Sequence, residues 1–400
     1  MHLFINALAA SAGGGLTYLR NLIPHLADRN DVHTTVFLSG RLRNELPESK
    51  NISFLQADNS SSIVSRFWFE QWELRRLIRR NKVDVLLSAG NFAIWDSPVP
   101  QILLSRNSLY TSRHFNSDLR DRGEYRLWID THLKRVVAKW SIYAADSTVA
   151  PSEAFAQELR EWTGRKIRVI HHGFDKEAFH GDSSPLPAAT QKQLSSRAHA
   201  FRLLFISHYN YYRNFETLFR AIPLIKRGLG SRPIALFLTC KLVAGANPGT
   251  YRTDSASRLV RELGISNDVV ELGAIPYRLL HHVYRAADVY VSPAYAESFA
   301  HPLVESMSSG LPVVASDLPV HKEVCGSAAI YFERFSPQQL AERVVEIAQV
   351  PQLAAQLSKT GIERSTVFSW KNHVERIVEL AKSLMPQFGL NTIQPNRVSQ

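Results

Sequence analysis

Short apolar runs alternate along this chain of 400 residues with stretches that carry an apolar residue at every third or fourth position. Short apolar runs are typical of buried strands, and the 3.6-residue period is typical of amphipathic helices. Regular alternation of the two favours a parallel sheet with helices on both faces. In the first part of the chain the pattern predicts strands at 2–8, 33–38, 83–88, 101–104, 147–150 and 167–170, and helices at 16–28, 63–80, 113–145 and 152–162.

A segment rich in Ser, Pro, Ala and Gln, residues 181–200, lacks strong periodicity and is predicted to be a linker. The alternation restarts after it, which predicts a second doubly wound α/β domain. The predicted strands are 203–207, 234–239, 269–272, 288–292, 313–315 and 329–331, and the predicted helices are 214–227, 255–263, 277–286, 302–309 and 337–348. The predicted division is a first domain at 1–180, the linker, a second domain at 201–369, a final helix at 370–385 and an unstructured tail at 386–400.

Composition fits a globular protein with two cores, since 45% of the residues are hydrophobic and 21% are charged. Only Cys240 and Cys325 are present, without metal-ligand spacing, which fits a reducing compartment. No run of about 18 apolar residues occurs and no leader pattern precedes the first strand. We therefore expect a cytoplasmic protein.

A formal net charge of +11 favours anionic partners: nucleotide diphosphates, nucleic acid or an anionic membrane surface. No nucleic-acid-binding motif is present, so nucleic acid is not expected. Basic and aromatic residues coincide at 66–80 and at 113–139, with Trp128 and the following Trp140. Two interpretations stay open for these helices. One is an interfacial helix at the inner membrane face, and the other is a core-facing helix with a solvated basic side.

Two glutamates separated by seven residues, Glu297 and Glu305, form the most informative motif. The predicted strand 288–292 precedes it, and the predicted helix 302–309 begins near Pro302. The first carboxylate therefore belongs to the loop at the carboxyl end of a strand, and the second lies about one turn into the helix. In an open α/β sheet ligands bind at that edge, and a helix N-terminus suits phosphate.

The spacing and its neighbours resemble the E-x7-E signature of retaining, nucleotide-sugar-dependent glycosyltransferases of the GT-B fold, in glycosyltransferase family 4. The resemblance covers roughly residues 1–384 and implies two Rossmann-like domains facing across a cleft. The first domain would take the acceptor, the second would bind the nucleotide sugar, and the final helix would cross back to the first. It implies that Glu297 contacts sugar hydroxyls and that Glu305 binds the ribose. It also implies that Ser298, Phe299 and Ala300 hold sugar and phosphate through their backbone.

The segment from Phe205 to Asn214 is similar to the family's Gly-Arg-x4-Lys-Asn pattern, whose two cations hold the diphosphate. Arg213 takes the Lys position and can bind phosphate in a bidentate way. His208 stands where the first cation is expected, which departs from the pattern. Either His208 donates to phosphate as a neutral group, or donor binding is weaker and depends on pH.

Three further contacts follow from the resemblance. Gly14 and Gly15 belong to a glycine loop that approaches the donor phosphates, although a plain strand-to-helix turn stays an alternative. The backbone around Gly273 and Pro276 would meet the nucleobase. Arg106 with the adjacent Asn107 would line the acceptor side, where many relatives carry His-Asp or His-Asn.

No Asp-x-Asp, His-x3-His or cysteine cluster occurs, so neither a metal nor another cofactor is expected. The predicted function is a retaining, metal-independent hexosyl transfer from a UDP or GDP sugar to a glycan or lipid-linked glycan, in the cytoplasm or peripherally on the inner membrane. Two alternatives remain. One is a nucleotide-binding partner subunit that has lost catalysis, and the other is a sugar-nucleotide epimerase on the same fold.

Overall fold

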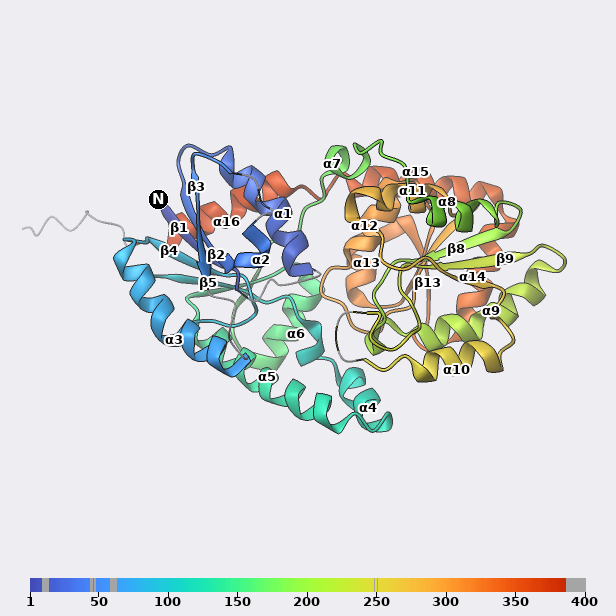
Figure 1. Cartoon of the computed structure of the whole chain (residues 1–400), viewed down its shortest axis with the longest axis horizontal. Helices are drawn as coiled ribbons and strands as arrows, with labels where there is room; N and C mark the ends of the chain where they lie inside the picture. The colour runs from blue at the N-terminus through green and yellow to red at the C-terminus, as the bar shows by residue number, and fades with distance from the viewer. Residues whose placement is uncertain are drawn as a thin grey trace, which may run out of the picture. The chain divides into compact units, whose positions relative to one another are not determined.

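The computed structural model describes residues 1–8, 14–43, 46, 48–57, 63–247, 249 and 251–385. They form two parallel β-sheets, each with helices on both sides (Figure 1). The tail predicted at 386–400 lies outside the described residues. The α/β class with two doubly wound sheets, predicted from the alternation of strand and helix patterns, is confirmed.

The first sheet has seven strands in the order β3-β2-β1-β4-β5-β6-β7. Its strand order reverses between β1 and β4, which pair in parallel from Leu3 opposite Val85 to Asn6 opposite Ser88. The strands are β1 His2–Asn6, β2 His33–Ser39, β3 Ile52–Ala57, β4 Val85–Ser88, β5 Gln101–Leu104, β6 Ser147–Ala150 and β7 Ile167–Val169.

The second sheet has six strands in the order β10-β9-β8-β11-β12-β13. The reversal lies between β8 and β11, where Val289 pairs with Leu203 and Tyr290 with Leu204. The strands are β8 Phe201–Phe205, β9 Ile234–Leu238, β10 Val269–Glu271, β11 Val289–Ser292, β12 Val313–Ser316 and β13 Ala329–Phe332.

Helices lie between most consecutive strands, as parallel pairing favours, whereas residues 89–100 join β4 to β5 without a helix. The α-helices are α1 Gly14–Ala27, α2 Gly40–Arg43, α3 Ile63–Arg80, α4 Arg113–Asp121, α5 Tyr125–Ala144, α6 Glu153–Thr163, α7 Lys176–His180, α8 Ala188–Ser195, α9 Phe215–Leu229, α10 Asp254–Glu262, α11 Leu280–Arg285, α12 His301–Ser308, α13 Pro319–Cys325, α14 Pro337–Gln349, α15 Pro351–Ser365 and α16 Trp370–Leu384. Short 3-10 turns are η1 Ser108–Tyr110, η2 Tyr211–Arg213, η3 Tyr277–Leu279 and η4 Gly326–Ala328.

The sequence predictions of local structure were wrong or incomplete in several places, and the helices α2, α7, α13 and α15 were not predicted. The single helix predicted at 113–145 is two helices, because Gly123 takes a left-handed φ of 67° that ends α4. The predicted linker contains α8, whose buried side is only Thr190 and Leu194, too small to give a periodic signal. The edge strand β3 was missed, since Ile52, at 6% exposure, is its one buried residue.

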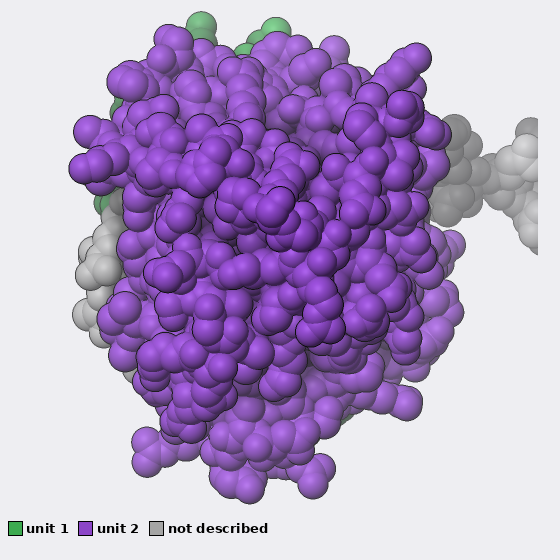
Figure 2. Space-filling view, turned by 90° about the vertical axis from the view of Figure 1, so that its right-hand side faces the viewer, with its two compact units in different colours: residues 1–104, 140–148, 374–400 green, residues 105–139, 149–373 purple. Residues whose placement is uncertain are grey.

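Two compact units divide the chain: residues 1–104, 140–148 and those from 374 on form the first, and residues 105–139 and 149–373 form the second (Figure 2). The core of the second unit joins β8, β9 and β11 to α9 and α14. It includes Phe115 and Leu119 of α4, at 1% and 0% exposure. The α4 helix therefore packs on the second sheet, whereas the sequence division placed it in the first domain. The predicted domain boundaries as a set stay a prediction.

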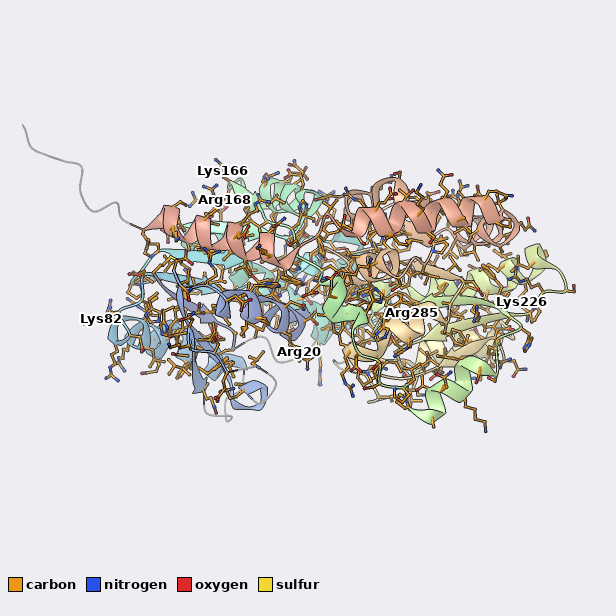
Figure 3. The ribbon with its side chains drawn as sticks, turned by 90° about the horizontal axis from the view of Figure 1, so that it is seen from above. Arg20, Lys82, Lys166, Arg168, Lys226 and Arg285 are labelled. Atoms are coloured by element: carbon orange, nitrogen blue, oxygen red, sulfur yellow. The ribbon has the colours of Figure 1, made fainter. Side chains whose placement is uncertain are left out.

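Basic side chains are spread over both units (Figure 3). Arg20 and Lys82 lie in the first unit, and Lys166, Arg168, Lys226 and Arg285 lie in the second. Within the described residues, no helix is both long and apolar enough to cross a membrane.

Candidate functional site

The predicted donor residues lie on two loops at the switch point of the second sheet. The loop 206–214 follows β8, and the loop 293–300 follows β11. These strands are neighbours in the sheet although they are not consecutive in the chain. Their loops therefore flank the crevice at the carboxyl edge where open α/β sheets bind ligands.

Side-chain hydrogen bonds to the backbone fix the loop 293–300. Asn214 Nδ2 donates to the carbonyl of Pro293 at 3.1 Å, and Ser316 Oγ donates to the carbonyl of Ala294 at 2.6 Å. Asn214 is held for this contact in a left-handed conformation, φ 56°, that asparagine tolerates better than most residues. The loop is thus anchored to the segments on both sides of it.

Ser298 is anchored in the same way. Its hydroxyl donates to the carbonyl of Arg106 at 2.8 Å, and its own carbonyl accepts from Ser152 Oγ at 2.7 Å. Ser152 also caps α6 by accepting from the amide of Phe155. The structure therefore brings the predicted acceptor-side Arg106 against the predicted donor-side Ser298.

Glu297 forms an ion pair with Arg213, the predicted cation of the loop after β8. The two side chains are only 10% and 20% exposed, respectively. The Arg213 guanidinium also lies 5.2 Å from the ring centroid of Tyr212. Because a desolvated charge is costly without a partner, this pair fixes both groups at the crevice.

Glu305 is buried inside α12 and 4% exposed. Tyr284 donates its hydroxyl to Glu305 Oε2 at 2.8 Å, and the hydroxyl of Tyr277 also hydrogen-bonds the carboxyl group. Burial raises the pKa of Glu305 to about 7, although the two tyrosine hydrogen bonds lower it. Glu305 therefore titrates near neutral pH.

The start of α12 supplies backbone N–H groups beside these carboxylates. Ala300 is the N-cap residue, with φ 66°, and Pro302 lies in the first turn. Phe299 is buried, with its ring 5.3 Å from the rings of both His172 and Phe368. A helix N-terminus held at a sheet's carboxyl edge is suited to phosphate.

Other predicted residues lie apart from this group or take structural roles. Gly273 has φ 82°, and a Cβ there would lie 3.1 Å from Lys241 Cε, so glycine suits both the backbone and the space. Pro276 precedes η3 as its N-cap residue. Asn107 caps η1 by accepting from the amide of Leu109 at 3.1 Å, which gives it a structural role.

The glycine loop stays a prediction. Helix α1 begins at Gly14 and continues through Gly15, and residues 9–13 before it lie outside the described residues. Both glycines belong to the first unit.

Two family models match the sequence. The model described as Glycosyltransferase Family 4 matches residues 12–178, and the model described as Glycosyl transferases group 1 matches residues 189–364. The chain belongs to this glycosyltransferase family. The resemblance seen in the E-x7-E motif is confirmed.

Curated relatives of this glycosyltransferase include D-inositol 3-phosphate glycosyltransferases. The protein of Corynebacterium aurimucosum is 24% identical over 285 residues, which cover 69% of this chain and 64% of the relative. The protein of Mycolicibacterium vanbaalenii is 29% identical over 245 residues, which cover 59% of this chain and 52% of the relative. The chain thus spans between about half and two thirds of the length of these relatives.

Solved structures similar to this glycosyltransferase share its GT-B fold. Sucrose-phosphate synthase from Thermosynechococcus elongatus aligns with a TM-score of 0.75 at 21% identity, covering 96% of this chain and 99% of that one. Anabaena HepE in complex with UDP-glucose aligns with a TM-score of 0.73 at 19% identity, covering 96% of this chain and 100% of that one. These structural alignments show the fold, so the prediction of two Rossmann-like GT-B domains is confirmed.

His208 is the main departure of this glycosyltransferase from its family pattern. Its side chain is exposed, and partial desolvation followed by the nearby Arg213 charge lowers its pKa. The imidazole is therefore neutral near pH 7 without ligand, and a bound diphosphate would raise its pKa.

We expect pyrophosphate affinity to fall from pH 6 to pH 8, because the protonated imidazole binds the anion better. Titration calorimetry at each pH measures the pyrophosphate affinities of the wild type and of His208→Asn. The ratio of these two affinities cancels the titration of pyrophosphate itself. A ratio that stays constant across the range would contradict a phosphate contact at His208.

Sequence reasoning missed the tyrosines that hold Glu305 and a buried histidine cluster. His172 Nδ1 lies 3.0 Å from His301 Nε2, and the His301 ring stacks 6.1 Å from Trp370. Burial lowers the pKa of His301 to about 3, so this group stays neutral. The residues around His172 show no sequence pattern that predicts a contact with α12.

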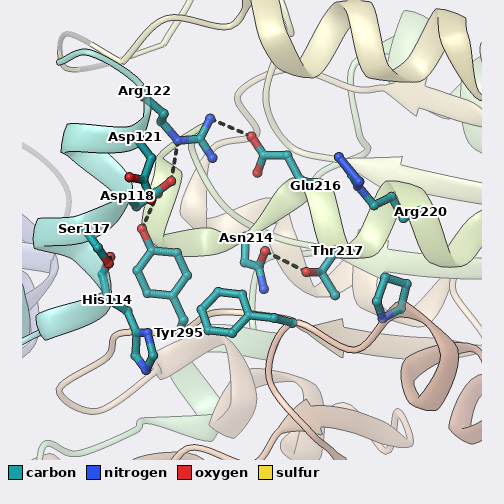
Figure 4. A pocket seen from close by; sticks show the side chains of 12 residues that line it. His114, Ser117, Asp118, Asp121, Arg122, Asn214, Glu216, Thr217, Arg220 and Tyr295 are labelled. Atoms are coloured by element: carbon teal, nitrogen blue, oxygen red, sulfur yellow. Dashed lines mark hydrogen bonds and ion pairs between the residues drawn. The ribbon is translucent and has the colours of Figure 1, made fainter.

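A cavity of about 550 Å³ lies beside the site (Figure 4). Tyr295 donates its hydroxyl to Asp118 at 2.5 Å, and Arg122 bridges Asp118 at 2.7 Å and Glu216 at 2.9 Å. Exposed His114 lies at this cavity, 5.2 Å from the Phe335 ring. Neither Glu297 nor Glu305 lines it. The lining residues are His114, Ser117, Asp118, Asp121, Arg122, Asn214, Glu216, Thr217, Arg220, Tyr295, Phe335 and Pro337.

Among the described residues, no group of three or more His, Cys, Asp or Glu side chains could hold a metal ion. Metal independence stays a prediction.

Proposed function

We propose that this glycosyltransferase moves a hexose from a nucleotide diphosphate sugar to a glycan or lipid-linked glycan, with retention of the anomeric configuration. The observation that carries the proposal is the ion pair between Glu297 and Arg213, which joins the two loops at the switch point of the second sheet, with the buried Glu305 in the helix that follows. Carboxylates there can accept from sugar and ribose hydroxyls, and the guanidinium can bind the diphosphate.

In the proposed reaction the acceptor oxygen bonds to the anomeric carbon from the face that the diphosphate leaves. The bond between that carbon and the phosphate oxygen breaks, and the departing oxygen takes the acceptor's proton. Arg213 and the N–H groups at the start of α12 stabilise the charge that develops on the diphosphate. The enzyme's work is therefore positioning and electrostatics, and it needs no covalent intermediate.

UDP sugars are the first donors to test, because the similar HepE structure contains UDP-glucose. Calorimetry with UDP, GDP and ADP identifies the base class. Release of the matching diphosphate from a donor panel, with and without candidate glycan acceptors, then measures turnover, with Glu297→Ala as the control. Acceptor-dependent release that Glu297→Ala abolishes supports the proposal.

The departures at His208 and Arg106 favour one second candidate, a nucleotide-binding partner subunit without catalysis. In that case the protein would bind a nucleoside diphosphate tightly. With every donor, the wild type would release diphosphate no faster than Glu297→Ala does.

A further inference from the structure

The long helix α5 carries a stripe of large apolar side chains that face solvent. Tyr125 is 63% exposed, Ile129 52%, Leu133 64% and Val136 56%. Their spacing of four, four and three residues places them on one side of the helix. A contiguous exposed apolar face of this kind marks an interaction surface in a soluble domain.

The opposite side of α5 is packed, so the orientation of the stripe is fixed. Thr131 is 6% and Ala138 4% exposed. Half-buried Trp128, which borders the stripe, also packs against the core of the second unit. The sequence left two interpretations open, an interfacial helix and a core-facing helix with a solvated basic side. The packed side of α5 agrees with the core-facing interpretation. For the stripe, whose residues are not part of the core of the second unit, the interfacial interpretation stays open.

A shallow apolar groove of about 340 Å³ lies between α5 and Trp162 of α6. Two cations border it: the Arg135 guanidinium lies 5.6 Å and the Lys139 ammonium 5.9 Å from the Trp162 ring. Long basic side chains that cover an aromatic ring keep their charged ends at the water boundary. The groove is lined by Trp128, Ile129, His132, Leu133, Arg135, Val136, Lys139 and Trp162.

We propose that this face docks on an anionic phospholipid bilayer. The α5 surface consists of Tyr125, Ile129, Leu133, Val136, Arg135, Lys139 and Trp162. Its apolar groups would enter the boundary between headgroups and acyl chains, with an acyl chain along the groove, while the two cations meet lipid phosphates.

Charge decides between a membrane and a second copy of the chain. The spacing of the stripe would also suit helix pairing, but a symmetric pair places Arg135 and Lys139 near the same cations of the other copy. A chain with net charge +11 is repelled by its copy and attracted by an anionic leaflet. This inference does not rest on the proposed function.

Sedimentation of the full chain with lipid vesicles tests the proposal. We expect binding to vesicles of phosphatidylcholine with phosphatidylglycerol, and little binding to phosphatidylcholine alone. Leu133→Glu should lower the partition coefficient about tenfold, since it places a charge where an apolar group inserts. Lys139→Gln should lower it about fivefold, and high salt should remove that difference. Val367→Glu, at a position 58% exposed outside α5, is the matched control and should bind like the wild type.

Three outcomes would overturn the proposal: no binding to anionic vesicles, equal binding by Leu133→Glu, or a wild-type dimer in light scattering that Leu133→Glu converts to monomer. The last outcome would identify the α5 surface as a contact between copies. Nucleoside diphosphate affinity, measured by calorimetry in solution, should be the same in all these variants, which separates the result from any failure of the proposed function.

Discussion

Glu297→Gln is expected to lower kcat by about 10² to 10³, with little change in the affinity for free nucleoside diphosphate. The carboxylate is paired with Arg213 and is 10% exposed, so it acts in a largely desolvated place where an oriented charge has a large effect. A free diphosphate lacks the hexose that Glu297 is proposed to hold. Initial rates of diphosphate release give kcat, and calorimetry gives the affinity.

A double-mutant cycle separates catalysis from support of the fold. Either single change, Glu297→Gln or Arg213→Gln, leaves a charge of the opposite sign without its partner and should lower the free energy of unfolding. The double variant removes both charges, so its stability should recover while its kcat stays low. Recovery of kcat together with stability would show that the pair is structural only.

The chain offers a matched ion pair as a control. Arg202 Nη2 lies 2.8 Å from Asp288 Oδ1, at the amino ends of β8 and β11, and the two side chains are 26% and 28% exposed. Arg202→Gln removes a comparable pair from the opposite edge of the same sheet. It should change kcat by less than about twofold, as expected for a partly exposed structural pair.

The sequence predicted the fold because its signals are local. The strand before Glu297 is a buried apolar run, and α12 shows its start at Pro302 and its end at Gly310, whose φ is 70°. The E-x7-E spacing needs only neighbouring residues to be recognised. Its location at the switch point of the sheet follows from the alternation of strands and helices.

What supports the site could not be predicted, because the partners are distant in the chain. Ser152 and Ser298 are 146 residues apart, and Glu305 and Tyr284 are 21 apart. A hydroxyl or phenol that forms such a contact has no periodic or spacing signal. The tertiary structure alone shows that Glu305 is enclosed by tyrosines and has an unusual pKa.

Glu305→Gln is expected to stabilise the ligand-free protein above neutral pH. The folded-state pKa of Glu305 is about 7, above the ordinary value of 4.5. For a carboxyl group with a raised pKa, the stabilising protonated form is fully present below about pH 4.5, and its contribution is lost as the pH rises through about 7. At pH 8 the variant should therefore be more stable than the wild type by about 3 kcal/mol, and at pH 4.5 the two should be alike. Urea unfolding at both pH values measures the difference.

The same change should weaken nucleotide binding, because a ribose hydroxyl donates best to an ionised carboxylate. In the His208→Asn background the opposing imidazole effect is absent, and UDP affinity is compared with and without Glu305→Gln at each pH. The ratio of the two affinities cancels the titration of UDP itself, and it should rise in favour of Glu305 from pH 6 to pH 8. Glu158 is the control: burial also raises its pKa, and it accepts from Thr111 Oγ1 at 2.6 Å without contacting the site. Glu158→Gln should thus stabilise the protein at pH 8 and leave UDP affinity unchanged. If neither Glu305→Gln nor Glu158→Gln changed the UDP affinity, Glu305 would not bind ribose. Burial of a carboxyl group alone predicts only the gain in stability.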